Sequence, residues 1–268
     1  MMKRIIAIDI DGTLFNDQSK YDIERFNRDY ADLLSKEILM VPTTGNSYDA
    51  VRQIFCYSPQ VTTFIAENGG RVVVKGKELG SRPHPWSFLN QLIPCLDNYH
   101  ADLLSLSGSQ QTYIERQYEN VPVPFYPHHS YFTNLKEIMD DNIYNVNISW
   151  FRSKLHQKKI QEIVDHLNQQ FVGQLTATYS GAYGIDILPF GVNKKIGLKT
   201  LVESFPNLSL TDVVAFGDTS NDVEMLQAVG RGYAMKNATP DLLAVADQVT
   251  EKDNNHEGLL NEIENLFL

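Results

Sequence analysis

The sequence predicts an α/β protein, in which a Rossmann-like core around a parallel sheet carries a separate, inserted α+β domain. Short apolar segments alternate with amphipathic helical segments near both ends of the chain. Such alternation is typical of strand–helix–strand units with parallel strands. Between the two regions the composition changes, because the middle of the chain holds most of the aromatic residues and histidines. We therefore expect the sheet to begin in the first region and to be completed in the last.

The first region, residues 1–80, contains the first strands of this sheet. The isoleucine-rich run RIIAIDI has no alternating pattern, which indicates a strand buried on both faces. The helix at 47–57 has Ser47 as its expected N-cap. The elements expected in order are a strand at 4–10, a helix at 22–36, a strand at 37–42, a helix at 47–57, a strand at 62–66 and a hairpin arm at 71–79.

The inserted domain is predicted to span residues 81–189. It begins at the breaker cluster SRPHP. Within it we expect a half-buried strand in VNISWF, one amphipathic helix at 153–171, and two strands in LTATYSG and YGIDILP.

The core resumes at residue 190 and runs to residue 268. Its segments again alternate between helix and strand. The expected elements are helices at 194–205, 223–229, 239–246 and 258–268, and strands at 213–217, 232–235 and 248–250. The core is therefore predicted to comprise residues 1–80 and 190–268.

The charge and composition exclude several classes of protein. The chain has 268 residues with 33 Asp and Glu against 23 Lys and Arg, so its net charge is −10. A chain this acidic is unsuited to coat nucleic acid or an anionic membrane surface. Asp9 and Asp11 interrupt the N-terminal apolar run, and no segment approaches the ~20 apolar residues of a membrane span. We expect a cytoplasmic monomer or weak homo-oligomer, with no nucleic-acid or membrane partner.

Four polar motifs lie at predicted strand ends or helix starts. They are DIDGTL at 9–14, TTGN at 43–46, Lys194 in GVNKK, and GDTSND at 217–222. In open α/β sheets, ligands bind at the edge where the parallel strands end. These motifs are therefore expected to meet in one site.

Such a site has a definite chemistry. Converging carboxylates repel one another unless a cation lies among them, and hard oxygen ligands select Mg²⁺. One carboxylate can then act as the nucleophile on phosphorus, and its neighbour as the general acid and base. Lys194 and the Thr44 hydroxyl can hold the phosphoryl oxygens.

Taken singly, each motif also has an ordinary structural explanation. DIDGT and TTGN are common turns, GDTSND is a plausible capping loop, and a lysine in an amphipathic helix is usually solvated. Their shared position at strand ends and their order along the chain favour the functional interpretation.

Together the motifs resemble those of the haloacid dehalogenase-like phosphatase superfamily. DIDGTL matches the first motif, DxDGT[LV], while TTG, Lys194 and GDTSND are similar to the second, third and fourth. The ENGG turn at 67–70 and the closing NHEGLLNEI resemble the Cof-type sugar phosphatase subgroup. That subgroup has a class II cap between the second and third motifs, where residues 81–189 lie. In the cap, the resemblance rests on position and size alone.

The resemblance implies a role for each matching residue. Asp9 would be the nucleophile, and Asp11 the general acid and base. Thr44, Gly45, Lys194 and Asn221 would bind the phosphoryl group. Mg²⁺ would be held by Asp9, the backbone carbonyl of Asp11, Asp218 and Asp222, the last through water or by orienting the other ligands. Lys195 is an alternative to Lys194, although the GVNK register favours Lys194.

The chain departs from the subgroup at Asn46, where an arginine is usual. Its absence removes a bidentate anion clamp and puts the leaving-group preference in doubt. The predicted function is a Mg²⁺-dependent phosphatase that acts on small phosphorylated metabolites, with sugar phosphates as the expected class, through an aspartyl-phosphate. The alternatives are a phosphotransferase or phosphomutase of the same superfamily, and a non-catalytic phospho-acceptor module such as a signalling receiver.

Overall fold

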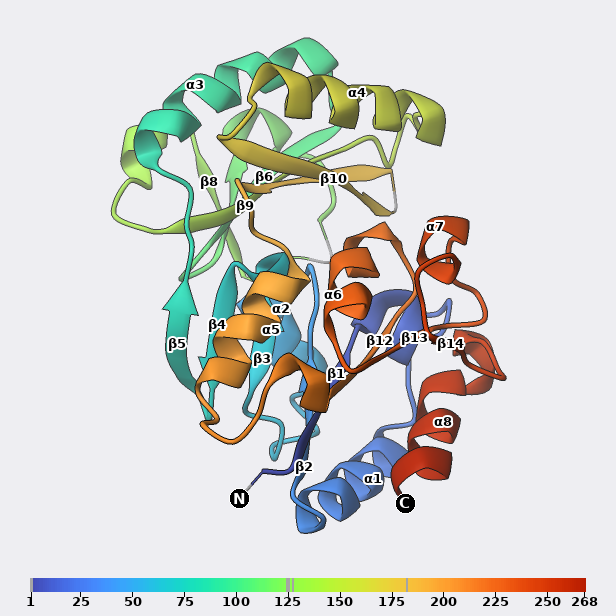
Figure 1. Ribbon diagram of the computed structural model, residues 1–268. Helices are drawn as coiled ribbons and strands as arrows, with labels where there is room; N and C mark the ends of the chain where they lie inside the picture. Colours follow the sequence, from blue (N-terminus) through green and yellow to red (C-terminus); the bar gives the residue numbers. More distant parts are fainter. Residues whose placement is uncertain (1, 124–125, 127, 182) are drawn as a thin grey trace. The chain divides into compact units, whose positions relative to one another are not determined.

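The computed structural model describes residues 2–123, 126, 128–181 and 183–268. The chain forms two compact units (Figure 1). The first unit comprises Met1–Thr44, Phe55–Gly80 and Asn193–Leu268, and the second comprises Gly45–Ile54 and Ser81–Val192.

A five-stranded parallel sheet forms the centre of the first unit. Its order is β14-β13-β12-β1-β2, so strands from the two ends of the chain lie side by side, as the blue and orange ribbons of Figure 1 show. The central strands are continuous apolar runs buried on both faces, as parallel strands usually are. This sheet confirms the predicted α/β class. The strands are β1 (Arg4–Ile8), β2 (Ile38–Pro42), β12 (Val213–Gly217), β13 (Arg231–Ala234) and β14 (Gln248–Val249).

Five helices accompany this sheet in the described part of the first unit. Asp22 caps α1 by accepting from the backbone N–H of Arg25 at 2.9 Å, and Asn193 caps α5 by accepting from that of Ile196 at 3.0 Å. Leucines of α5 pack on β1 and β2 to form the core. The helices are α1 (Ile23–Ser35), α5 (Lys194–Glu203), α6 (Val223–Ala228), α7 (Pro240–Leu243) and α8 (Gly258–Phe267).

The expected third strand of the parallel sheet is placed differently in the structure. β3 (Phe64–Ala66) pairs antiparallel with β4 (Arg71–Val74) in a three-stranded sheet completed by β5 (Lys77–Ser81). A single parallel bridge, Thr43 to Ile65, links β3 to the chain beyond β2. A three-residue strand followed by a tight turn pairs most readily with its sequence neighbour, which explains the difference.

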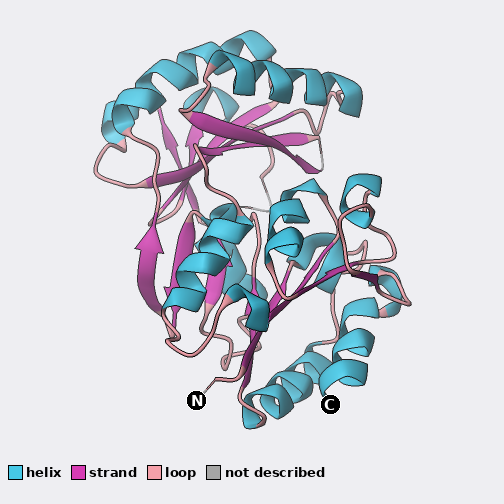
Figure 2. Ribbon diagram, viewed as in Figure 1, coloured by secondary structure: helices cyan, strands magenta, loops and turns pink. Residues whose placement is uncertain are grey.

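The second unit is built on a six-stranded mixed sheet. Its order is β10-β11-β9-β6-β7-β8, and all the pairings are antiparallel except that between β7 and β8. Two helices, α3 and α4, cover one face of the sheet (Figure 2) and form an apolar core with it. The elements are α2 (Tyr48–Ile54), α3 (Trp86–Leu96), α4 (Gln157–Gln170), β6 (Leu103–Gly108), β7 (Thr112–Glu115), β8 (His129–Phe132), β9 (Ile143–Ser149), β10 (Leu175–Gly181) and β11 (Gly184–Pro189).

The sequence patterns identified only part of this second unit. β9, β10, β11 and α4 were predicted, whereas α3 and β6 to β8 were not. The buried apolar residues of α3 do follow helical spacing, but this segment, which also contains Pro94, was not predicted as a helix. They are Phe88, Leu89, Leu92, Ile93 and Leu96. The helix expected at 47–57 is the shorter α2, with Ser47 accepting from the backbone N–H of Ala50 at 3.2 Å. Across the described ranges, no helix combines the length and the apolar character that crossing a membrane requires.

Candidate active site

The candidate site lies in the first unit, where its parallel strands end. Asp9 follows β1, Thr43 follows β2, and Asp218 follows β12. Backbone hydrogen bonds hold these ends together, because Asp9 N–H donates to Phe216 O at 3.0 Å and Thr43 N–H donates to Ile8 O at 2.7 Å. The parallel direction of the strands therefore places these residues at one edge of the sheet.

Three carboxylates meet at this edge. Asp9, Asp218 and Asp222 each offer one oxygen, and the three oxygens lie within 4.8 Å of one another. All three residues are buried, with exposures of 5, 8 and 0 %. Clustered anionic oxygens without soft ligands are suited to a hard divalent cation, so the residues present fit Mg²⁺.

Lys194 is the cation that the chain itself supplies to this cluster. Its Nζ lies 2.6 Å from Asp9 Oδ1 and 2.6 Å from Asp222 Oδ1, and the residue is 1 % exposed. It is the first residue of α5, directly after the N-cap Asn193. Lys195, the alternative left open by the sequence, is exposed. The lysine among the carboxylates is therefore Lys194.

Asp222 is fully engaged by the chain. Its Oδ1 pairs with Lys194, and its Oδ2 accepts from the backbone N–H groups of Asp218 at 3.0 Å and Thr219 at 3.3 Å. Asp222 therefore orients both Lys194 and the loop that carries Asp218.

The turn after β1 brings the chain close to Asp218. Gly12 has a φ of +77°, and an added Cβ would collide with the Asp218 carboxylate. Thr13 Oγ1 donates to Asp218 Oδ1 at 3.3 Å, and Asn237 Nδ2 donates to Gly12 O at 2.9 Å. Asp11 lies on this turn and is exposed. Thr13 belongs to the DIDGTL motif, but neither it nor Asn237 was predicted to have a role in the site.

For Thr44 and Asn221, the structure gives hydrogen bonds to β3 and to the turn that follows it. Thr44 is buried, and its N–H donates to Ile65 O at 2.9 Å. Asn221 is half-buried, and its Nδ2 donates to Asn68 Oδ1 at 3.0 Å. Gly45 and Asn46 belong to the second compact unit, so their place in the site stays a prediction.

Burial and mutual repulsion disfavour the charged carboxylates. Burial raises the pKa of the Asp9 carboxyl well above its usual range, and the lowering effect of Lys194 does not offset this. Burial, together with the charge of Asp222, raises the pKa of Asp218 to about 7. Burial acts to lower the pKa of Lys194, but the charges of Asp222 and Asp9 outweigh it and raise that pKa above its ordinary value. The Lys194 ammonium therefore stays charged. The positive charge near Asp9 and Asp218 is too small to keep their pKa values in the usual range.

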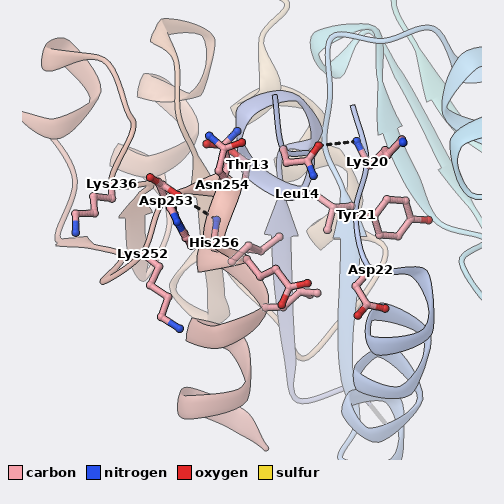
Figure 3. Close-up of a pocket in the computed structure, with 15 residues that line it drawn as sticks. Thr13, Leu14, Lys20, Tyr21, Asp22, Lys236, Lys252, Asp253, Asn254 and His256 are labelled. Atoms are coloured by element: carbon pink, nitrogen blue, oxygen red, sulfur yellow. Dashed lines mark hydrogen bonds and ion pairs between the residues drawn. The ribbon is translucent and has the colours of Figure 1, made fainter. Parts of the chain in front are cut away.

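A cavity of about 670 Å³ lies beside the turn that follows β1 (Figure 3). Thr13 and Leu14 line it, but Asp9, Lys194, Asp218 and Asp222 are not among its lining residues. Figure 3 shows Lys20 on the opposite side of the cavity from Lys236 and Lys252, so these ammonium groups do not converge on one ligand. The cavity and the carboxylate cluster are therefore different parts of the first unit.

The sequence matches a known protein family over nearly its whole length. The model of the haloacid dehalogenase-like hydrolases matches residues 6–263. The chain belongs to this family. The family resemblance of the motifs is confirmed, as are the α/β fold predicted from the alternating segments and the expectation of a hydrolase.

Named relatives of the chain are phosphatases. The chain is 28 % identical to the 5-amino-6-(5-phospho-D-ribitylamino)uracil phosphatase YbjI of Escherichia coli K12 over 275 residues, covering all of this chain and 97 % of the relative. It is 26 % identical to the kanosamine-6-phosphate phosphatase of Bacillus subtilis 168, covering 98 and 92 %. The crystal structure of SMU.1108c from Streptococcus mutans UA159 superimposes with a TM-score of 0.87 at 27 % identity, covering 99 and 98 %.

Proposed function

We propose that this protein is a Mg²⁺-dependent phosphatase that hydrolyses small phosphorylated metabolites through an aspartyl-phosphate on Asp9. The observation that carries the proposal is the buried Lys194, whose Nζ bridges Asp9 and Asp222 beside Asp218. An ammonium inside a carboxylate cluster lowers the pKa of Asp9, although burial outweighs this effect, and it offers positive charge to an incoming phosphoryl group.

The reaction proceeds in two displacements. An Asp9 carboxylate oxygen attacks phosphorus, the ester P–O bond breaks, and Asp11 donates a proton to the leaving oxygen. Asp11 then accepts a proton from water as the water oxygen attacks the same phosphorus. The bond between phosphorus and Asp9 breaks, inorganic phosphate leaves, and the Asp9 carboxylate is restored. Asp11 lies on the turn that directly follows Asp9, and it is exposed.

Asp9, Asp218 and the backbone carbonyl of Asp11 would hold Mg²⁺, and Asp222 would support it from outside the inner ligand set. When bound, Mg²⁺ supplies positive charge to the phosphoryl oxygens. Thr13 positions the Asp218 carboxylate through its 3.3 Å hydrogen bond. Lys194, Thr44, Gly45 and Asn221 would contact the transferring phosphoryl group.

The substrate class follows from the relatives. Kanosamine-6-phosphate and a phosphoribityl compound, named in two of them, both carry phosphate on a hydroxylated carbon chain or ring. We infer that this chain acts on sugar phosphates or similar phosphorylated metabolites. Residues 81–189 would form the cap that selects the leaving group, and residues 1–80 and 190–268 the catalytic core.

Replacing Asp9 tests the proposal directly. Asp9→Asn removes the nucleophile, so phosphate release from a panel of sugar phosphates with Mg²⁺ should fall by at least about 1,000-fold. Asp32→Asn is a matched control, because it removes the same charge from an exposed site on α1. Near-normal turnover by Asp9→Asn would overturn the mechanism. Recovery of an isomerised sugar phosphate instead of free phosphate would indicate a mutase.

A further inference from the structure

The turn between β3 and β4 has an unusual backbone. Three consecutive residues have positive φ angles, 55° at Glu67, 51° at Asn68 and 94° at Gly69. The left-handed conformation is unfavourable for residues with a Cβ, and it persists only where surrounding contacts hold it. Because two such residues occur in succession, we expect contacts with other segments to hold this turn in place.

The backbone of this turn contacts two segments of the candidate site. Asn68 N–H donates to Thr44 O at 2.9 Å, which ties the turn to the chain beyond β2. Gly69 packs so closely on Asn193 that an added Cβ would collide with the Asn193 carbonyl. Asn193 is the N-cap of α5 and directly precedes Lys194. The turn thus joins the Thr44 and Lys194 segments.

The Asn68 side chain reaches a third segment. Asn68 is 1 % exposed, and its Oδ1 accepts from Asn221 Nδ2 at 3.0 Å. The other end of that amide is held as well, because Asn221 Oδ1 accepts from Thr219 Oγ1 at 2.9 Å. In this arrangement, Asn221 Nδ2 is the donor towards Asn68 and Asn221 Oδ1 is the acceptor from Thr219. They leave the second N–H of its Nδ2 available for another acceptor.

We propose that Asn68 is a positioning residue, whose carbonyl oxygen holds Asn221 so that its remaining N–H donates to the phosphoryl group. The inference rests on the proposed function, because it assigns that N–H a phosphoryl oxygen as acceptor. Without Asn68, the Asn221 amide can rotate and present its oxygen, which repels an anion. The left-handed turn places Asn68 at the point where the Thr44, Lys194 and Asn221 segments meet.

The first measurement is the binding of inorganic phosphate with Mg²⁺ by calorimetry, since it requires no turnover. Asn68→Gly deletes the amide but retains a residue that tolerates positive φ. We expect its Kd for phosphate and its KM for a sugar phosphate to rise about tenfold, with a smaller change in kcat. Lys75→Gly is the matched control, because Lys75 has a φ of 52° on the exposed β4–β5 turn. A merely structural role would lower the active fraction and leave Kd and KM unchanged.

A double-mutant cycle with Asn221→Ala tests whether Asn68 acts through Asn221. We expect the double variant to bind phosphate no more weakly than Asn221→Ala alone. Additive losses, or an unchanged Kd in Asn68→Gly, would overturn the inference while Asp9-dependent turnover of the wild type upholds the proposed function. A wild type that binds phosphate but shows no turnover would overturn the function, and the cycle would still decide the role of Asn68.

Discussion

Lys194 is enclosed by the carboxylates of the site and has almost no contact with solvent. Its Nζ makes two ion pairs of 2.6 Å, with Asp9 and Asp222. Removing one partner of a buried ion pair leaves the other charges uncompensated, which typically costs about 3–5 kcal/mol. The same residue is proposed to hold the phosphoryl group, so stability and activity both depend on it.

The neighbouring lysines provide a paired test at this position. We expect Lys194→Met to lower kcat/KM by about 100- to 1,000-fold, because a charge aimed at the phosphoryl oxygens is lost. Lys195→Met should retain nearly full activity, since Lys195 is exposed. Steady-state phosphate release by the two purified variants is the measurement. Equal losses in both would contradict the assignment of Lys194.

His84 in the second unit predicts how stability depends on pH. Burial lowers the pKa of its imidazole from 6.5 to about 4. The hydrogen bond to Ile187 O at 2.9 Å raises this pKa, but by less than burial lowers it. The unfolded chain therefore takes up a proton below pH 6.5 that the folded chain resists. The stabilisation is fully present above pH 6.5 and is lost as the pH falls towards 4, by about 3 kcal/mol in total.

This pH effect can be isolated with one variant. In His84→Gln the titrating group is absent, so the variant should lack the part of the stability loss between pH 6.5 and 4 that His84 causes. Both tryptophans, Trp86 and Trp150, belong to the second unit, so their fluorescence in urea titrations follows its unfolding. Identical pH profiles for the variant and the wild type would show that His84 is not responsible.

Among the elements, β10 is an edge strand that the chain protects with a side chain. It lies at one end of the six-stranded sheet, and its sequence LTATYSG contains neither the charges nor the proline that usually guard an edge. The Asn168 amide of α4 donates to Ala177 O at 2.9 Å and accepts from Ala177 N–H at 2.8 Å. Asn168 thus replaces the missing neighbouring strand at this residue.

Deleting this amide is expected to weaken the second unit. Asn168→Ala removes two hydrogen bonds from the edge and should lower the free energy of unfolding by about 1–3 kcal/mol. Gln169→Ala, an exposed position on the same helix, should change it by less than ~0.5 kcal/mol. Urea unfolding followed by tryptophan fluorescence compares the two. A loss in Gln169→Ala as large as that in Asn168→Ala would show that the effect does not come from the two hydrogen bonds to Ala177.

For the molecule as a whole, the carboxylate cluster lowers the free energy of unfolding of the metal-free protein. Burial and neighbouring charge disfavour ionised Asp9 and Asp218. Asp218→Asn removes one of these charges and should stabilise the metal-free protein by about 0.5–2 kcal/mol while abolishing turnover.

Mg²⁺ at about 100 times its Kd should stabilise the wild type by ~2.7 kcal/mol, because it binds to the folded state alone. Scanning calorimetry with and without Mg²⁺ measures both effects, and an equal Mg²⁺ shift in Asp218→Asn would place the metal elsewhere.

Much of this molecule was predictable from local sequence patterns. Apolar runs and helical periodicity identified the strands and helices of the parallel sheet, because each pattern depends only on near neighbours. The same patterns placed Asp9, Lys194, Asp218 and Asp222 at strand ends and helix starts. Parallel strands end at a common edge, so a shared site could be inferred without coordinates. Three of these four side chains form the buried carboxylate cluster, and the fourth lies among them.

The tertiary structure decided the features that depend on residues distant in the sequence. The contact of Thr13 with Asp218 and that of Asn68 with Asn221 each span more than 150 residues. By itself, the sequence determined which chemical groups the site contains and at which edge they meet. Their orientation depended on side-chain contacts that no local pattern encodes, because these contacts form between distant residues only in the folded chain.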